Sequence, residues 1–159
     1  MLSDLIKPEN VIVRLESADK DSLFYELVEN LVRTNPGLDR NEIYKGLLER
    51  EALMNTCIMR GIGVPHCSVS CTGKPLIAVG LSSEGIDYEI EGTGTKDYDD
   101  NLVHLVFMIL FEQGNAGRHL HVLANCARVL HIPGFYKAIL GARTAHEVCN
   151  LIREFETEF

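Results

Sequence analysis

The longest apolar run of the chain, residues 102–111, restricts the possible folds more than any other segment. Its ten residues are mainly Val, Leu, Ile, Met and Phe, and His104 is the polar exception. An unbroken apolar run of this length is typical of a strand that is covered on both faces. We therefore expect a central strand here, with His104 hydrogen-bonded inside the core or at an edge.

Strand and helix patterns alternate along the rest of the chain. Residues 11–15 and 76–81 are short, apolar and partly β-branched, as strands are. Apolar residues recur at helical spacing in five segments, near residues 19–33, 39–53, 118–131, 135–140 and 144–155. The alternation predicts an α/β sandwich. A chain of 159 residues can bury one core, so we expect a single domain over 1–159.

Two helices begin with a capping-box pattern, in which one side chain caps the helix and a Glu three residues later reaches back. The pairs are Asp39 with Glu42 and Thr144 with Glu147. Between the regular segments, residues 67–73 are small and polar and are expected to form a loop. Residues 89–101 are rich in Gly, Asp and Glu and are expected to form an exposed insertion.

The helix expected at 118–131 has a candidate buried stripe, formed by Leu120, Leu123, Ala124, Ala127 and Leu130. Relative to that stripe, His119 falls at the boundary of the buried face and His121 faces solvent. A boundary histidine in a first helical turn can present a ring N–H to an anion, beside free backbone N–H groups. From the residues alone, His119 would pass for an ordinary flanking residue.

Charge and hydropathy exclude several classes of function. The chain has 23 acidic and 15 basic residues, a net charge of −8. Such a surface repels nucleic acid and would attract a basic protein partner. The N-terminus lacks a basic segment followed by an apolar core, and no apolar run reaches the roughly 18 residues of a membrane span. We expect a cytoplasmic protein without membrane insertion.

Five cysteines, an odd number without a signal-peptide pattern, predict reduced thiols instead of a disulfide framework. A zinc site is the alternative, because four possible ligands lie within fifteen residues: Cys57, His66, Cys67 and Cys71. No C-x-x-C is present, and in an extended backbone His66 and Cys67 point to opposite faces, so no metal is expected. Cys126 and Cys149 occupy apolar helical positions and are expected in the core.

A glycine-punctuated segment, residues 60–67, contains the clearest candidate for chemistry. Gly61 and Gly63 allow backbone angles and close approaches that side chains prevent, and Pro65 restrains the backbone just before His66. One imidazole is thereby presented with little bulk around it. A neutral histidine has a lone pair and can accept and release a phosphoryl group. The alternative is a strand-terminal histidine that only bonds a neighbouring carbonyl.

Six motifs, which together span nearly the whole chain, give this histidine a context. They are Arg50-Glu51-Ala52-Leu53 with Thr56, Gly61 to His66, Lys74 to Gly80, Glu84 to Asp87 with Tyr88, Val103 to Phe107, and His119-Leu120-x-x-Leu123-Ala124. This set resembles the enzyme IIA components of the bacterial phosphotransferase system, in the fructose, mannitol and nitrogen-regulatory branch. The resemblance implies a small mixed β-sheet flanked by helices.

The resemblance also implies a reaction, in which a phosphoryl group passes from a phosphohistidine of an HPr-type carrier to Nε2 of His66. It implies that His119 is a second active-site histidine that orients the group by a hydrogen bond. Arg50 would neutralise the phosphoryl charge, for which a guanidinium is well suited. Near the end of a helix, Arg50 could equally be a surface charge that favours the helix dipole.

Further residues would set the geometry of the site: Thr56, Arg60, Gly61, Gly63 and Pro65, with the two glycines leaving a gap for the donor. The match to the family weakens here. Where the family usually has Gly-Ser, this chain has Met54-Asn55. At three positions that are commonly Gly, Gly and Asn, it has Cys57, Met59 and Arg60, and at the position of a usual alanine it has Gly63. Methionine side chains would narrow the approach of a donor, and Arg60 would add positive charge near the phosphate.

No nucleotide-binding motif G-x-x-x-x-G-K-[ST] is present, so we expect no cofactor and a phosphoprotein donor. The opening Leu2 to Ile6 resembles the nitrogen-regulatory members, which implies a regulatory enzyme IIA whose phosphorylation state protein partners read. One alternative is a fructose- or mannitol-type enzyme IIA that passes the group to a cysteine of an enzyme IIB. Another is an inactive relative that only binds proteins.

Overall fold

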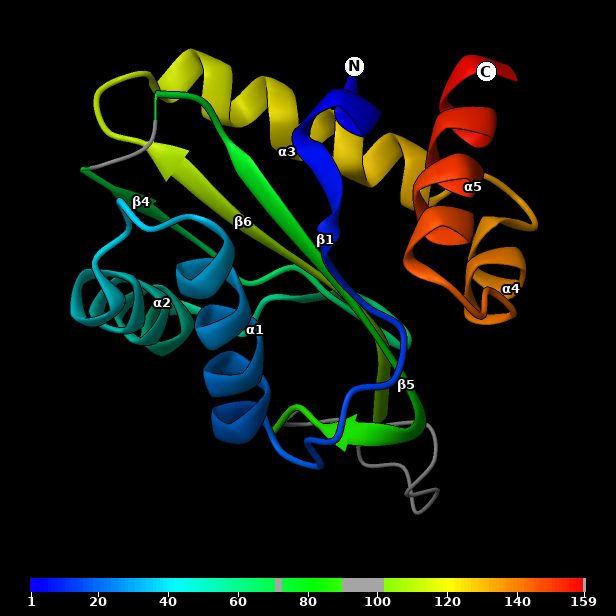
Figure 1. Ribbon diagram of the computed structural model, residues 1–159, viewed down its shortest axis with the longest axis horizontal. Helices are drawn as coiled ribbons and strands as arrows, with labels where there is room; N and C mark the ends of the chain where they lie inside the picture. The colour runs from blue at the N-terminus through cyan, green and yellow to red at the C-terminus, as the bar shows by residue number, and fades with distance from the viewer. Residues whose placement is uncertain (71–72, 90–101, 159) are drawn as a thin grey trace.

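The computed structural model describes residues 1–70, 73–89 and 102–158. Apart from Glu89, the exposed insertion expected at 89–101 lies outside the described residues. The described chain forms a mixed β-sheet with helices on both of its faces (Figure 1). This arrangement confirms the predicted α/β sandwich.

Six described strands make up the sheet: β1 (Ile6–Ile12), β2 (Cys57–Met59), β3 (Ile62–Gly63), β4 (His66–Val69), β5 (Leu76–Asp87) and β6 (Leu102–Glu112). Their order is β1-β5-β6-β3-β2, and β4 also pairs with β6. β5 runs antiparallel to β6, whereas β3 and β4 run parallel to it. β3 and β4 therefore lie along one edge of β6 like two pieces of a single strand.

The central position of β6 confirms the interpretation of the apolar run. Its alternate side chains enter two separate cores, with Phe107 on one face of the sheet and Met108 on the other. Nδ1 of His104 lies 2.8 Å from the carbonyl oxygen of Ser82. This histidine is therefore hydrogen-bonded within the structure, as expected.

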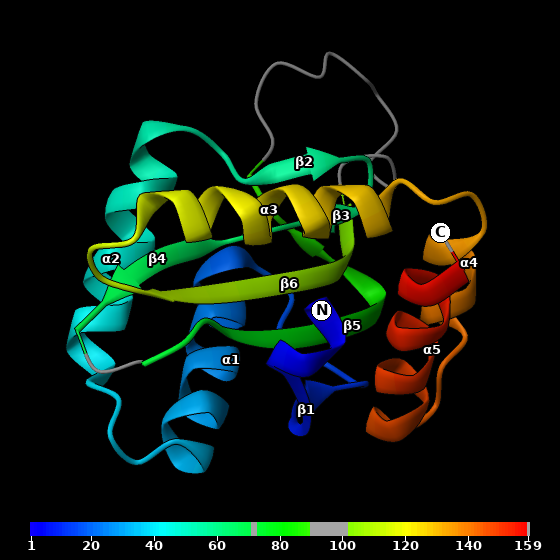
Figure 2. The same cartoon turned by 90° about the horizontal axis from the view of Figure 1, so that it is seen from above.

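The helices form two groups on opposite sides of the sheet (Figures 1 and 2). On one side lie α1 (Lys20–Thr34) and α2 (Arg40–Leu53), and on the other lie the 3-10 helix η1 (Leu2–Leu5), α3 (Ala116–Leu130), α4 (Phe135–Leu140) and α5 (Ala145–Glu158). In Figure 2, α3 lies over the sheet along the central strand β6. Each group buries one apolar core against the sheet.

The predicted helix caps are observed, but neither predicted capping box closes. Thr144 accepts from the N–H of Glu147 at 3.1 Å, whereas the carboxylate of Glu147 accepts from the N–H of Arg143 at 2.7 Å. Asp19 caps α1 and Asp39 caps α2, as the sequence indicates. Glu42 does not complete a capping box, because its carboxylate accepts hydrogen bonds from the backbone N–H and the hydroxyl of Ser70 at 2.6 and 2.8 Å. A carboxylate that binds a distant loop is no longer available to its own helix end.

Three expected boundaries are wrong. The strand expected at 76–81 continues to Asp87 as β5. The strand expected at 11–15 instead runs over 6–12, and Pro8 within it obscured the pattern; β1 is an edge strand, where a proline is tolerated. Residues 67–69, expected in a loop, belong to β4. Their small polar composition hid an alternation in which Cys67 and Val69 are buried and Ser68 is exposed.

The buried face of α3 also differs from the prediction. Leu120 is 69% exposed, whereas Val122, Cys126 and Val129 are buried. The predicted and the observed stripes have the same i, i+4, i+7 spacing, so the spacing alone cannot separate them. Relative to the prediction, α3 is turned about its axis so that the side of Val122 faces the sheet. His119, three residues before Val122, lies on this same side of the helix.

The two ends of the described chain are held together by a buried carboxylate. Glu156 of α5 accepts hydrogen bonds from the backbone N–H groups of Leu2 and, at 3.0 Å, of Ser3. The side chain of Glu156 is buried where η1 packs on α5. One residue near the C-terminus therefore caps the first turn of the chain.

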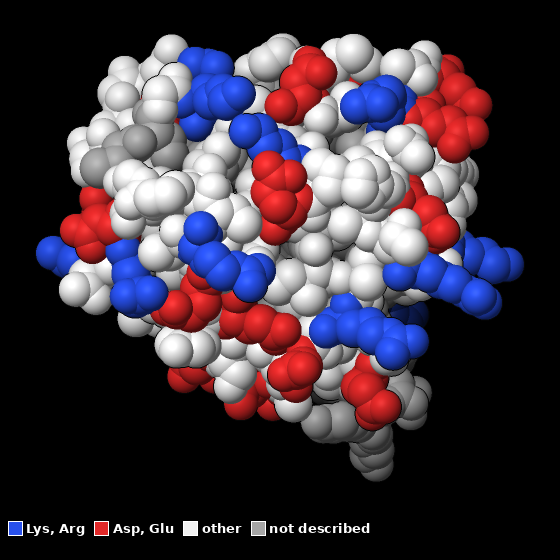
Figure 3. Space-filling model, in the orientation of Figure 1, with Lys and Arg blue, Asp and Glu red and all other residues white. Residues whose placement is uncertain are grey.

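The described surface is charged but not of one sign. Acidic and basic side chains are interspersed over the face seen in Figure 3. Among the described residues, no helix combines the length and apolar character needed to cross a membrane.

Candidate functional site

His66 is the first residue of β4. It pairs with Ile109 of β6, whose N–H donates to the carbonyl of Pro65 at 2.9 Å. Neighbouring residues of a strand face opposite sides. Cys67 enters the core below α2, so the ring of His66 lies on the α3 side. The proline thus fixes the strand start that presents the histidine.

The partners of the His66 ring fix its tautomer. Nδ1 lies 2.8 Å from the carbonyl oxygen of Val64, and because a carbonyl can only accept, Nδ1 carries the proton. Nε of Arg50 lies 3.3 Å from Nε2, and because a guanidinium can only donate, Nε2 holds the lone pair. The ring nitrogen of His66 that holds a lone pair is therefore Nε2.

Arg50 lies in the last turn of α2, where its charge favours the helix dipole. Besides its contact with His66, it donates from Nη1 to the carbonyl oxygen of Met54 at 2.9 Å. The same side chain therefore binds the loop after α2 and places a positive charge beside Nε2. The structure brings together the two residues that the sequence analysis paired.

Electrostatics keep His66 neutral. Burial lowers the pKa of His66, the carbonyl of Val64 raises it, the charge of Arg50 lowers it further, and the carboxylate of Glu51 raises it. The net shift is below the ordinary value of 6.5, so the ring is uncharged at pH 7. Only the uncharged ring has a lone pair for attack.

The second predicted histidine lies on the same side of the sheet. His119 is in the first turn of α3, and its Nε2 donates to the carbonyl of Glu112 at 2.6 Å. The ring of Phe111 contacts both histidines: it stacks on His119 with centroids 4.3 Å apart and meets His66 edge-on at 6.2 Å. Because Nε2 of His119 is engaged, only Nδ1 can donate to a bound anion, and only when the ring is doubly protonated.

Both glycines of the segment make room for tyrosine rings of the chain itself. Gly61 has a φ of 82°, and a Cβ there would overlap the hydroxyl of Tyr136. A Cβ on Gly63 would lie 3.0 Å from Cζ of Tyr88. At these two positions, the space expected for an incoming donor is therefore occupied by tyrosine rings of the chain itself. The sequence does not indicate which ring packs against a glycine, so it could not predict these contacts.

Thr56 and Arg60 occupy different environments. Thr56 is 2% exposed, and its hydroxyl bonds the carboxylate of Glu51 and lies 2.6 Å from the hydroxyl oxygen of Tyr88. Its carbonyl accepts from the N–H of Val64 at 2.9 Å. Thr56 therefore acts on the site through the backbone. Arg60 is exposed at the turn between β2 and β3.

Sequence reasoning did not find Phe111 or the buried polar residues around Glu51 as parts of the site. Phe111 is one more apolar residue in a strand pattern. Nζ of Lys20 lies 3.0 Å from Oε2 of Glu51, but the two residues are 31 positions apart. A local sequence pattern cannot show that residues so far apart are in contact. The one indication that Glu51 belongs to the site is its place next to Arg50 in the motif that resembles the family.

The possible zinc ligands do not converge. Sγ of Cys67 lies 3.7 Å from the carbonyl of Ile43, on the face of the sheet away from His66. Residues 1–70, 73–89 and 102–158 contain no group of three His, Cys, Asp or Glu side chains placed to hold a metal, and Cys71 lies outside them. Cys126 and Cys149 are free and buried, as predicted.

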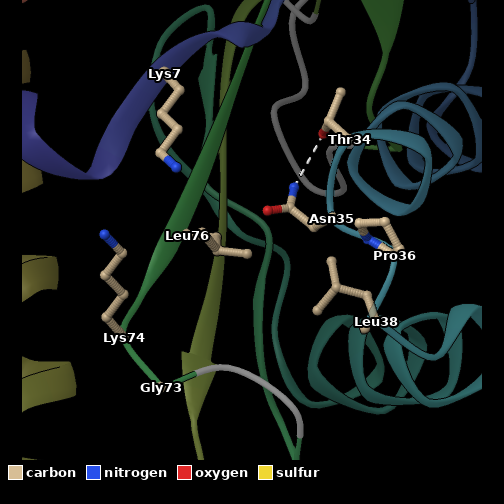
Figure 4. A pocket seen from close by; sticks show the side chains of 9 residues that line it. Lys7, Thr34, Asn35, Pro36, Leu38, Gly73, Lys74 and Leu76 are labelled. Carbon is tan, nitrogen blue, oxygen red and sulfur yellow. Dashed lines mark hydrogen bonds between the residues drawn. The ribbon is translucent and has the colours of Figure 1, made fainter.

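A pocket of about 330 Å³ lies away from these residues, between the end of α1 and the start of β5 (Figure 4). Its lining includes Lys7, Asn35, Leu38 and Lys74, and none of the predicted site residues. The candidate site therefore lies on the surface around His66 and not in this pocket.

Comparisons with known proteins agree with the architecture. A family model described as "Phosphoenolpyruvate-dependent sugar phosphotransferase system, EIIA 2" matches residues 4–155. The chain is 28% identical, over 155 residues, to the fructose-specific EIIABC component of Bacillus subtilis (strain 168). That match covers 98% of this chain and 23% of the relative, so the chain spans about a quarter of that protein.

Two further proteins are similar over nearly their full lengths. A nitrogen regulatory protein of Bradyrhizobium diazoefficiens is 26% identical over 151 residues, which are 95% of this chain and 94% of that protein. The crystal structure of the nitrogen regulatory protein IIA-Ntr from Neisseria meningitidis has a TM-score of 0.81 at 21% identity, covering 95% of this chain and 98% of that one. The chain therefore belongs to the EIIA 2 family of the phosphoenolpyruvate-dependent sugar phosphotransferase system.

Proposed function

We propose that the chain, as a single enzyme IIA domain over 1–159, is a phosphocarrier that accepts a phosphoryl group on Nε2 of His66. The observation that carries the proposal is the ring geometry, in which Nδ1 is bound to Val64 and the lone pair on Nε2 faces Arg50. Family membership supports the reaction class. The donor is a phosphohistidine of an HPr-type carrier protein.

In the transfer, the lone pair of Nε2 attacks phosphorus while the N–P bond of the donor breaks, and the donor ring keeps that electron pair. Positive charge develops on the His66 ring and is stabilised by the carbonyl of Val64, which accepts from Nδ1–H. Arg50 leaves Nε2 and donates to the phosphoryl oxygens. His119, whose Nε2 is bound to the carbonyl of Glu112, can donate to a phosphoryl oxygen from Nδ1.

Exposed apolar side chains beside the site favour a protein as donor. Leu53 and Met54, which follow Arg50, are 82% and 70% exposed, and Leu120, next to His119, is 69% exposed. Apolar side chains around a polar centre are typical of protein interfaces. We propose that these three side chains contact the donor and, later, the protein that reads or takes the phosphoryl group.

A regulatory role is the first candidate, in which partner proteins in the cytoplasm read the phosphorylation state of His66. It is supported by the similarity to nitrogen regulatory proteins over nearly their whole lengths. The second candidate is supported by the fructose-specific relative: an enzyme IIA that passes the group to a cysteine of an enzyme IIB. Discharge of the phosphoprotein by an added fructose-type enzyme IIB would favour the second role.

The proposed function is tested by intact mass after incubation with phosphoenolpyruvate, enzyme I and HPr. We expect an acid-labile phosphate on the wild type, none on His66→Ala and slower labelling of His119→Ala. His121→Ala, an exposed histidine of the same helix, is the matched control and should label like the wild type. A wild type that stays unmodified would leave the third candidate, a binding relative that is not phosphorylated.

A further inference from the structure

A buried polar group lies beneath the candidate site and consists of Lys20, Glu51, Thr56 and Tyr88; we call it the Glu51 cluster. Oε2 of Glu51 accepts from Nζ of Lys20 at 3.0 Å and from the N–H of Thr56 at 3.3 Å. Oε1 accepts from the hydroxyl of Thr56 and, at 3.4 Å, from that of Tyr88. The Lys20 and Glu51 side chains are 9% and 7% exposed.

Two routes lead from Glu51 to the ring of His66. The first follows α2 to the preceding residue, Arg50, whose Nε donates to Nε2. The second passes through the loop: the carbonyl of Thr56 accepts from the N–H of Val64, and the carbonyl of Val64 accepts from Nδ1. The two routes therefore end on the two nitrogens of one imidazole.

Stability alone is a weak reason for such a cluster. Burying an ion pair removes two charges from water, and apolar residues of similar volume often stabilise a fold equally well. Apolar contacts, however, do not fix the orientation of the groups that make them. In the Glu51 cluster each donor binds a defined carboxylate oxygen. The cluster thereby fixes both the last turn of α2 and the loop that follows it.

We propose that Glu51 is a positioning residue for phosphoryl transfer, which holds Arg50 and the carbonyl of Val64 in place on the two ring nitrogens of His66. The inference rests on the proposed function, because it concerns the same histidine. Glu51 does not touch the phosphoryl group. It acts through Arg50 and Val64, so that the ring keeps its tautomer and its direction.

The test variant is Glu51→Gln, which keeps the size of the side chain and removes its charge. The matched control is Glu29→Gln. Glu29 pairs with Arg40 and, like Lys20 with Glu51, joins α1 to α2, but it leads to no residue of the site. The control changes the net charge by the same amount. A double variant, Lys20→Met with Glu51→Leu, keeps the test decisive if Glu51→Gln unfolds, because an apolar pair replaces the ion pair.

Two measurements are made on each folded variant: the tautomer of His66 from long-range ¹H–¹⁵N spectra, and the rate of phosphorylation at varied phospho-HPr. Wild type and Glu29→Gln should show the Nδ1–H tautomer. The Glu51 variants should show a mixture, a maximal rate lowered roughly 10- to 100-fold and a KM within about twofold of wild type. A merely structural role would leave the tautomer unchanged.

A folded Glu51 variant with the wild-type tautomer and rate overturns the positioning role. An equal loss in Glu29→Gln overturns it as well, because the effect would then follow from net charge. A wild type that HPr does not phosphorylate overturns the proposed function instead, so the two failures are distinguishable.

Discussion

The imidazole of His66 lies between an acceptor and a donor, the carbonyl of Val64 and the guanidinium of Arg50. These two neighbours act in opposite directions on the pKa of the ring, and burial acts with the guanidinium. Burial and the guanidinium keep the ring neutral, and the two hydrogen-bonding neighbours decide which nitrogen is free. The state of this residue can therefore be tested without any partner protein.

Arg50→Gln should raise the pKa of His66, because it removes one of the causes that lower it. The pKa is measured by NMR titration of the ring, with the exposed His131 as an internal reference. The folded-state pKa lies below the unfolded value, so the unfolded chain binds more protons between the two. Above pH 6.5, the neutral ring of His66 makes its full contribution to the free energy of unfolding. That contribution is lost as the pH falls from 6.5 through the folded-state pKa of His66. The loss should be smaller in Arg50→Gln, and an unchanged titration would contradict this account.

Gly63→Ala, which introduces the residue usual in the family, should destabilise this chain. The added Cβ would lie 3.0 Å from Cζ of Tyr88, and that ring is completely buried. Overpacking of this kind costs about 1–3 kcal/mol of the free energy of unfolding, measured by urea denaturation. Gly73→Ala is the control, because a Cβ there meets nothing within 4 Å. Equal stability of the two variants would show that the ring moves aside at no cost.

At the scale of elements, α3 is apolar on two faces. One face is buried through Val122, Cys126 and Val129, and the other leaves Leu120 and Ala124 exposed. Helices bury one stripe when they cover a sheet, so a second apolar stripe indicates a different partner. The exposed stripe begins next to His119.

Substitutions on the two faces of α3 should therefore have different effects. Val122→Ala should lower the free energy of unfolding by about 2 kcal/mol, because Val122 is buried in the core. Leu120→Gln should change it by less than about 0.5 kcal/mol, yet raise the KM for phospho-HPr. Urea denaturation and phosphorylation kinetics separate the two effects. A KM unchanged in Leu120→Gln would remove this stripe from the docking surface.

The elements that the sequence predicts well are those with local causes. Asp19 and Asp39 cap α1 and α2 where expected, and the apolar run of β6 forms the central strand. The buried face of α3 could not be chosen, because two stripes have the same spacing. The ring beside Gly63 could not be predicted either, nor could two partners of Glu51, Lys20 and Tyr88, since they come from residues 25 or more positions away.

At the scale of the whole molecule, the carboxylate of Glu156 joins the two ends of the described chain. Glu156→Gln should lower the free energy of unfolding by about 1–3 kcal/mol, because one of its two acceptor oxygens is replaced by an NH₂ group against a buried N–H. Glu154→Gln, exposed on the same helix, is the control. Hydrogen exchange at Leu2 and Ser3 should quicken in Glu156→Gln alone. Equal exchange in both variants would contradict the prediction.

The parallel pairing of β4 with β6 also has a consequence for synthesis of the chain. His66 pairs with Ile109, which the ribosome adds 43 residues later. At usual rates of translation, this interval lasts roughly 2 to 9 s. Throughout it, His66 has no strand to hold its backbone, so a nascent chain cannot possess the ring geometry of the finished protein. Competence to receive a phosphoryl group should therefore arise late in biosynthesis, after release of the second half of the polypeptide from the exit tunnel.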